Sequence, residues 1–170
     1  MKNIVLCGFM GCGKSTVGRA LAEKLGMRLI DTDSYIEKKE GMTISRIFAE
    51  KGEDYFRKLE LEVCSELSCK KNCIISTGGG TLLNEKNVAE IKKGGKVYFL
   101  NVSPATVLTR LKYDTTRPLL QRKDKEAAVN ELLNKRLPLY MKAADYVIDA
   151  EQSPRAVCCK IMEISSGERV

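Results

Sequence analysis

Short runs of apolar residues alternate along this chain with longer segments in which apolar residues recur every three or four positions. The short runs have the length of buried strands, and the longer segments have the periodicity of amphipathic helices. Strands that alternate with helices are typical of a parallel sheet with helices on both faces. The pattern therefore predicts an α/β fold. The expected strands are Asn3–Cys7, 28–30, Cys73–Ser76, 96–102 and Tyr146–Asp149.

The predicted helices begin and end at residues that suit helix termini. Most starts combine a capping side chain with a favourable first turn or with a proline at the first position. Gly41, Gly52 and the pair Gly94-Gly95 are the expected stops. The expected helices are 16–25, 34–40, 43–51, 54–69, 85–93, 105–112 and 155–165.

The connection between the first strand and the first helix carries a specific motif. Residues 8–15 read Gly-Phe-Met-Gly-Cys-Gly-Lys-Ser, which fits the phosphate-binding pattern G-x-x-x-x-G-K-[ST]. Its glycines let backbone N–H groups approach phosphate oxygens, and the helix start adds further unpaired N–H groups. Lys14 is expected to contact the β- and γ-phosphates, and the Ser15 hydroxyl is expected to bind Mg²⁺. The motif predicts nucleotide binding rather than a plain glycine-rich turn.

The length and composition are those of one soluble domain. The chain has 170 residues, of which 44% are hydrophobic and 30% are charged, and we expect a single domain over residues 1–170. No apolar run approaches the ~20 residues that a membrane-spanning helix needs. Residues 1–3 lead directly into the first strand, so no signal segment is expected. We therefore expect a cytoplasmic protein that does not bind membranes.

The net charge of +7 leaves two interpretations open. A basic protein can bind nucleic acid, but here the lysines are scattered and no stacking motif or arginine-rich run accompanies them. A surplus of cations around small anionic substrates explains the charge equally well and is favoured. Histidine is absent from the chain, which excludes histidine-based triads and histidine-ligated metals.

The seven cysteines are an odd number without a repeated C-x-x-C pattern. Cys69 and Cys73 are too isolated for a zinc site, so reduced and mostly buried thiols are expected. Cys12 differs because it lies inside the phosphate loop. It is interpreted as a small filler residue, and the alternative is an oxidation-sensitive position.

Two carboxylates directly after the second strand suggest where a phosphoryl acceptor binds. Asp31 and Asp33 lie two residues apart, so on an extended segment both would face the crevice beyond the strand ends. One would hold Mg²⁺ or its waters, and the other would accept a proton from a substrate hydroxyl. The alternative is that Asp33 only caps the helix 34–40.

Glycines and arginines further along the chain suggest the rest of that site. Residues 78–80 are three consecutive glycines after the third strand, and they allow close backbone approach to a ligand. Arg57, Arg117 and Arg136 can each form paired hydrogen bonds with a carboxylate or phosphate, although a single arginine is more often a solvated surface group. Residues 113–125 are polar and interrupted by proline between two helices, which is typical of a lid.

Taken together, these motifs resemble those of the shikimate kinases in order and spacing. The resemblance implies a three-layer α/β/α fold whose central five-stranded parallel sheet has the order 2-3-1-4-5. It implies a substrate-binding segment at about 34–60 and a lid at about 112–125. It also implies transfer of the γ-phosphoryl group of ATP to the 3-hydroxyl of shikimate, giving 3-phosphoshikimate and ADP in chorismate and aromatic amino acid biosynthesis. The matching segments are 8–16, 31–33, 56–60, 76–80, 117–120 and 136–140.

The resemblance further implies a role for each matching residue. Asp33 corresponds to the carboxylate at the accepting hydroxyl, and Asp31 to the carboxylate near one Mg²⁺ ion. Arg57 and Arg136 resemble the pair that binds the substrate carboxylate, with Glu60 orienting Arg57. A monomer with ATP and shikimate as its partners is expected. Lys14 and Arg117 are the implied catalytic groups, and Ser15 is implied at the metal. Gly78, Gly79 and Gly80 are implied around the substrate ring. The residues implied around ATP are Gly11, Cys12, Gly13, Lys14, Ser15, Thr16, Arg110, Arg117, Gln152 and Pro154.

Two alternatives of different classes remain. A gluconate or nucleoside-monophosphate kinase would share the loop and the sheet, but the acidic pair, Arg57 and the three glycines favour the cyclic acid. A non-enzymatic nucleotide-binding switch would not need the pair of arginines. The motif Asn-Lys-x-Asp, expected of a guanine-binding protein, is missing from the sequence.

Overall fold

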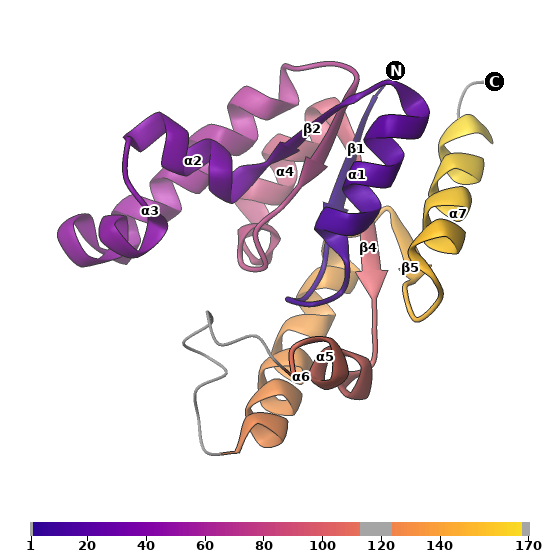
Figure 1. The fold of residues 1–170 in the computed structure, drawn as a ribbon. Helices are drawn as coiled ribbons and strands as arrows, with labels where there is room; N and C mark the ends of the chain where they lie inside the picture. Colours follow the sequence, from indigo (N-terminus) through magenta and orange to yellow (C-terminus); the bar gives the residue numbers. More distant parts are fainter. Residues whose placement is uncertain (1, 113–123, 168–170) are drawn as a thin grey trace.

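The computed structural model describes residues 2–112 and 124–167 (Figure 1). Five parallel strands form one sheet in the order β2-β3-β1-β4-β5, which confirms the expected order. The strands are β1 Asn3–Cys7, β2 Arg28–Asp31, β3 Cys73–Ser76, β4 Gly95–Asn101 and β5 Tyr146–Asp149. The helices are α1 Lys14–Leu25, α2 Thr32–Glu40, α3 Ile44–Ser68, the 3₁₀ turn η1 Thr81–Leu83, α4 Glu85–Gly94, α5 Pro104–Arg110, α6 Lys125–Ala143 and α7 Pro154–Gly167.

Helices cover both faces of this sheet, so the three-layer α/β/α fold is confirmed (Figure 1). On one face α1 approaches closely, because a Cβ atom on Gly18 would lie 2.9 Å from Leu29 Cδ1 and 3.5 Å from Leu6 Cδ1. On the other face Asn3 donates a hydrogen bond to the Leu67 carbonyl of α3 at 3.3 Å. Because helices cover both faces, β1 and β3 are buried along their whole lengths, which suits their mostly apolar sequences.

The structure tests the predicted helices at Gly52 and beside the predicted lid. The segments 43–51 and 54–69 both lie within α3, but Gly52 between them has the non-helical values φ 81° and ψ 172°, so two helices meet there at a kink. The helix stop expected at Gly52 is therefore confirmed. A second helix was expected beside the predicted lid, but the pattern did not define its bounds. In the structure this helix is α6, Lys125–Ala143.

No helix in the described part of the chain is long and apolar enough to cross a membrane.

The strands place several loop starts at one edge of the sheet. Asp31 pairs with Ser76 at the ends of β2 and β3, and Leu6 pairs with Ser76 from β1. The phosphate loop, the start of α2 and the three glycines follow these positions directly. In parallel α/β sheets, ligands bind in the crevice outside the carboxyl ends of the strands.

Candidate active site

A cavity of about 490 Å³ opens at this edge of the sheet. Its walls come from the phosphate loop, the junction of β2 and α2, the end of β3, α5 and the start of α7. Thirteen of the residues predicted for the site line it. They are Gly11, Cys12, Gly13, Lys14, Ser15, Thr16, Asp31, Asp33, Gly78, Gly79, Arg110, Gln152 and Pro154.

Three described residues predicted for the acceptor do not line this cavity. They are Gly80, Arg57 and Arg136. The two arginines lie beside Gly80 and Gly79, which belong to the glycine segment, residues 78–80, described below. The predicted lid arginine, Arg117, and residues 113–123 of the predicted lid lie outside the described residues.

The phosphate loop has the backbone that its glycines permit. Gly8, Gly11 and Gly13 have φ values of 145°, 75° and 102°, which other residues rarely adopt. Gly13 precedes α1 without a side-chain cap, so the first N–H groups of that helix remain available to an anion. Lys14 Nζ donates hydrogen bonds to the carbonyls of Gly8 at 2.7 Å and Phe9 at 3.0 Å. The ammonium group is thus held at the loop.

Cys12 fills space beneath this loop. Its side chain is buried, and a Cβ atom on Gly8 would lie 2.8 Å from its Sγ. The thiol therefore occupies the space that the missing side chain of Gly8 leaves, which agrees with the interpretation as a filler residue. Burial raises the pKa of the neighbouring Cys7 to about 12. All seven cysteines are unpaired and five are buried, as predicted.

Asp31 is the last, extended residue of β2, whereas Asp33 lies in the first turn of α2. Asp31 Oδ1 accepts a hydrogen bond from the Ser34 N–H at 3.1 Å and caps the helix that begins at Thr32. The expectation of an extended Asp31–Asp33 pair and the alternative that Asp33 is the cap are both wrong. The reason is that the helix begins at Thr32, so its capping residue is Asp31, two residues earlier than predicted. Both carboxylates nevertheless line the cavity, and Asp33 is left free of the capping role.

The surroundings of Asp33 favour its protonated form. Burial raises its pKa from 3.8 to about 6, and the nearby carboxylates of Asp31 and Glu60 act in the same direction, whereas Lys14 lowers it. A carboxylate with a raised pKa accepts a proton more readily than an ordinary aspartate. A hydroxyl bound beside Asp33 could therefore transfer its proton to this carboxylate.

Each of the three consecutive glycines lies beside a different charged side chain. A Cβ atom would lie 2.4 Å from Asp33 Oδ1 if placed on Gly78 and 3.3 Å from Arg57 Nη1 if placed on Gly80. On Gly79 it would lie 3.8 Å from Arg136 Nη1. None of the three has a positive φ, so no unusual backbone requires glycine here. An added Cβ would press closely on Asp33 at Gly78 and less closely on Arg57 at Gly80, and it would make only ordinary contacts at Gly79.

Arg57 is held by a buried carboxylate. Its Nη1 donates to Glu60 Oε2 at 2.7 Å, and Glu60 Oε1 accepts from Thr81 Oγ1 at 2.8 Å. Glu60 is only 3% exposed, and hydrogen bonds on both oxygens compensate its burial. The predicted contact between Glu60 and Arg57 is confirmed. Glu53, which the sequence did not suggest, also accepts from Arg57 Nη2 at 2.9 Å.

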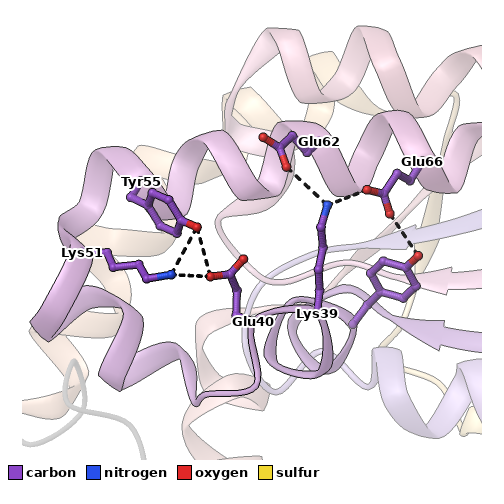
Figure 2. Close-up of polar contacts among 7 residues, drawn as sticks. Lys39, Glu40, Lys51, Tyr55, Glu62 and Glu66 are labelled. Carbon is purple, nitrogen blue, oxygen red and sulfur yellow. Dashed lines mark hydrogen bonds and ion pairs between the residues drawn. The ribbon is translucent and has the colours of Figure 1, made fainter.

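Surface contacts join α2 to both halves of the kinked helix α3 (Figure 2). Lys39 forms ion pairs with Glu62 at 3.3 Å and with Glu66 at 2.5 Å, both after the kink. Glu40 pairs with Lys51 at 2.7 Å, before the kink. Exposed pairs contribute little to stability individually. Their common effect is to fix α2, which carries Asp33, against α3, which carries Arg57.

Arg136 and Tyr140 lie one turn apart on α6 and face the same region. The guanidinium of Arg136 lies 5.9 Å from the centre of the Phe9 ring, within range of a cation–π interaction. The Tyr140 hydroxyl donates to the Gly79 carbonyl at 2.5 Å. Sequence reasoning assigned no role to Tyr140. The signals were its place at the end of the matching segment 136–140 and its spacing of four residues from Arg136, which puts both on the same helix face.

Arg110 connects the phosphate loop to the segment before α7. Its Nη1 donates to the Cys12 carbonyl at 3.2 Å, and its Nη2 donates to the Ala150 carbonyl at 3.0 Å. Gln152 and Pro154 follow directly and line the same cavity. The structure therefore brings together the three residues predicted around the adenine.

The oxygen atoms near the loop suit a magnesium ion bound together with phosphates. Ser15 and Asp31 both line the cavity. Among the described residues, no group of three or more acidic, cysteine or histidine side chains could hold a metal alone. Mg²⁺ commonly binds through one or two protein oxygens plus substrate phosphates and water, so this donor set fits it.

Comparison with known proteins identifies the family. The sequence profile described as "Shikimate kinase" matches residues 10–165. A shikimate kinase of Caldicellulosiruptor bescii is 47% identical over 165 residues, which are 96% of this chain and 95% of that protein. The structure of Acinetobacter baumannii shikimate kinase in complex with shikimate has a TM-score of 0.90 and 39% identity, covering 100% of this chain and 96% of that one.

A gluconokinase of Sinorhizobium meliloti shares the fold alone. Its structure has a TM-score of 0.57 at 16% identity, over 99% of this chain and 98% of that one. The difference in identity separates this rival from the shikimate kinases. The chain therefore belongs to the shikimate kinase family.

Proposed function

We propose that this chain transfers the γ-phosphoryl group of ATP to the 3-hydroxyl of shikimate. The observation that carries the proposal is the run of three glycines, which lie beside Asp33, Arg136 and Arg57 at the edge of the phosphate-loop cavity. An anionic polyol needs a cationic site for its carboxylate, an acceptor for a hydroxyl proton and close backbone walls. These residues supply all three requirements next to a nucleotide site.

On the donor side, backbone N–H groups of the loop and Lys14 bind the phosphates, while Arg110, Gln152 and Pro154 surround the adenine. Ser15 and Asp31 would hold Mg²⁺, which when bound would neutralise the charge of the phosphates during transfer. Positioning and charge neutralisation are most of what phosphoryl transfer requires.

On the acceptor side, Arg57 and Arg136 bind the substrate carboxylate. Asp33 accepts the hydrogen of the attacking hydroxyl and orients its oxygen toward the γ-phosphate. The gap left by Gly78 allows the Asp33 carboxylate to stand where it does. The enzyme acts as a monomer in the cytoplasm, which sedimentation velocity and cell fractionation would test.

The decisive experiment measures ADP release with shikimate, gluconate, AMP and CMP as acceptors. Only shikimate is expected to sustain turnover, and equal turnover with AMP would overturn the proposal. In Arg57→Ala, loss of charge-assisted hydrogen bonds is expected to raise the KM for shikimate roughly 10- to 100-fold. The matched control is Arg46→Ala, which removes an exposed arginine of the same helix that forms an ion pair with Glu50 of that helix. A collapse of ATP affinity in Arg57→Ala would contradict the assignment.

A further inference from the structure

The glycine segment is held by hydrogen bonds from two different helices. At one end, the Gly78 N–H donates to Thr32 Oγ1 of α2 at 2.9 Å. One residue later, the Gly79 carbonyl accepts from the Tyr140 hydroxyl of α6 at 2.5 Å. The peptide groups on either side of the Gly78–Gly79 peptide are therefore attached to α2, which carries Asp33, and to α6, which carries Arg136.

Tyr140 is itself firmly placed. Its side chain is 1% exposed, and its ring stacks on Phe99 of β4 with centroids 5.3 Å apart. Burial raises the pKa of its hydroxyl to about 12, so the group remains protonated and can donate to Gly79 at any physiological pH. The ring is fixed by the sheet, and the hydroxyl transmits that position to the glycine segment.

We propose that Tyr140 is a positioning residue for the phosphoryl acceptor, acting through the Gly79 carbonyl. This inference rests on the proposed function. Because Arg136 lies one turn before Tyr140, a single helix supplies both a substrate-binding cation and the anchor for the backbone beside it. The hydrogen bond sets the distance between that cation and the backbone wall of the acceptor site. Without it, the wall can move relative to both charges.

A purely structural role for this hydroxyl makes a different prediction. A buried hydroxyl that only satisfies a carbonyl would change stability and leave the affinities for both substrates alone. A positioning role would lower affinity for shikimate selectively, because the phosphate loop is attached elsewhere, through Arg110 and β1. The two roles therefore separate in a comparison of the two substrates.

The test is Tyr140→Phe, which keeps the ring and its stacking but removes the hydrogen bond. The KM and the calorimetric Kd for shikimate are expected to rise roughly 5- to 10-fold, with the KM for ATP unchanged within twofold. The matched control is Tyr98→Phe, which removes the hydroxyl of another buried tyrosine of the same core, stacked on Tyr146 at 5.1 Å. That control is expected to leave both KM values unchanged.

Three outcomes would overturn the inference. The first is a shikimate affinity of Tyr140→Phe within twofold of wild type, and the second is an equal loss in Tyr98→Phe. The third is an equal loss of ATP affinity, which would indicate a general core effect. Failure of the wild-type enzyme to phosphorylate shikimate would overturn the proposed function and this inference with it. If the wild-type enzyme phosphorylates shikimate and only the variants depart from the expected affinities, the result bears on Tyr140 alone.

Discussion

Substitution of Gly78 by alanine tests whether the glycine run exists to make room for charges. A methyl group at this position would lie 2.4 Å from Asp33 Oδ1 and 3.0 Å from Thr81 Oγ1. Ordinary van der Waals contact begins near 3.4 Å, so the carboxylate oxygen must move by about 1 Å. Asp33 is a short side chain that can rotate, so we expect the carboxylate rather than the backbone to move.

The displacement is small for the fold and large for the chemistry. Gly78 does not have a positive φ, and at such a position alanine changes stability by only about 0.4–1 kcal/mol, usually favourably. A misplacement of about 1 Å in a reacting group can lower the rate about 100-fold. We therefore expect kcat to fall about 100-fold in Gly78→Ala while the free energy of unfolding changes by less than about 1 kcal/mol.

Steady-state kinetics and urea unfolding of three variants would check this expectation. Gly80→Ala is the informative comparison, because its methyl group would lie 3.3 Å from Arg57 Nη1 and so acts on substrate binding. Its main effect should be a higher KM for shikimate. Gly167→Ala, at the end of α7, has no atom within 4 Å of the added carbon and should behave as wild type. A kcat of Gly78→Ala within tenfold of wild type, or a loss explained by unfolding, would refute the reasoning.

Two further predictions concern stability and thiol reactivity. In Gly94→Ala the added carbon would lie 1.8 Å from the Ser68 carbonyl oxygen, a backbone atom, so α3 and α4 must separate and the free energy of unfolding should fall by about 3 kcal/mol. An unchanged urea midpoint would contradict this. Iodoacetamide should label the exposed Cys69 and Cys159 of the native enzyme, whereas Cys7, with a pKa of about 12, should react only after unfolding. Peptide mass spectrometry would detect early labelling of Cys7, the contrary result.

The local elements of the fold were predictable because their signals are local. The strands Asn3–Cys7, Cys73–Ser76 and Tyr146–Asp149 have the predicted bounds, since each is a short apolar run between polar or glycine residues. Thr43 and Ser103 stand at the starts of the expected helices 43–51 and 105–112, and each caps its helix by accepting a hydrogen bond from the N–H group three residues later. The order of the strands within the sheet could not be predicted from local signals, because periodicity contains no information about which strands pair. That order came from resemblance to the family.

Local reasoning failed where two neighbouring residues suited the same role. Asp31 and Asp33 are both good helix caps, and only the folded chain shows that Asp31 takes the role. The contacts that hold the glycine segment were equally inaccessible. The Tyr140 hydroxyl reaches a carbonyl 61 residues away, and Thr32 accepts from an N–H 46 residues away. No spacing along the chain indicates such contacts.

The glycine run illustrates how this structure changes an interpretation that was partly right. Three consecutive glycines suggested close backbone approach to a ligand. In the folded chain, the space beside Gly78, Gly79 and Gly80 is next to charges from α2, α6 and α3 in turn. A side chain at Gly78 or at Gly80 would press on a different charge, whereas one at Gly79 would make only ordinary contacts, so the three positions are not equivalent. Substitutions along the run should therefore separate proton acceptance, which affects kcat, from carboxylate binding, which affects the KM for the acceptor.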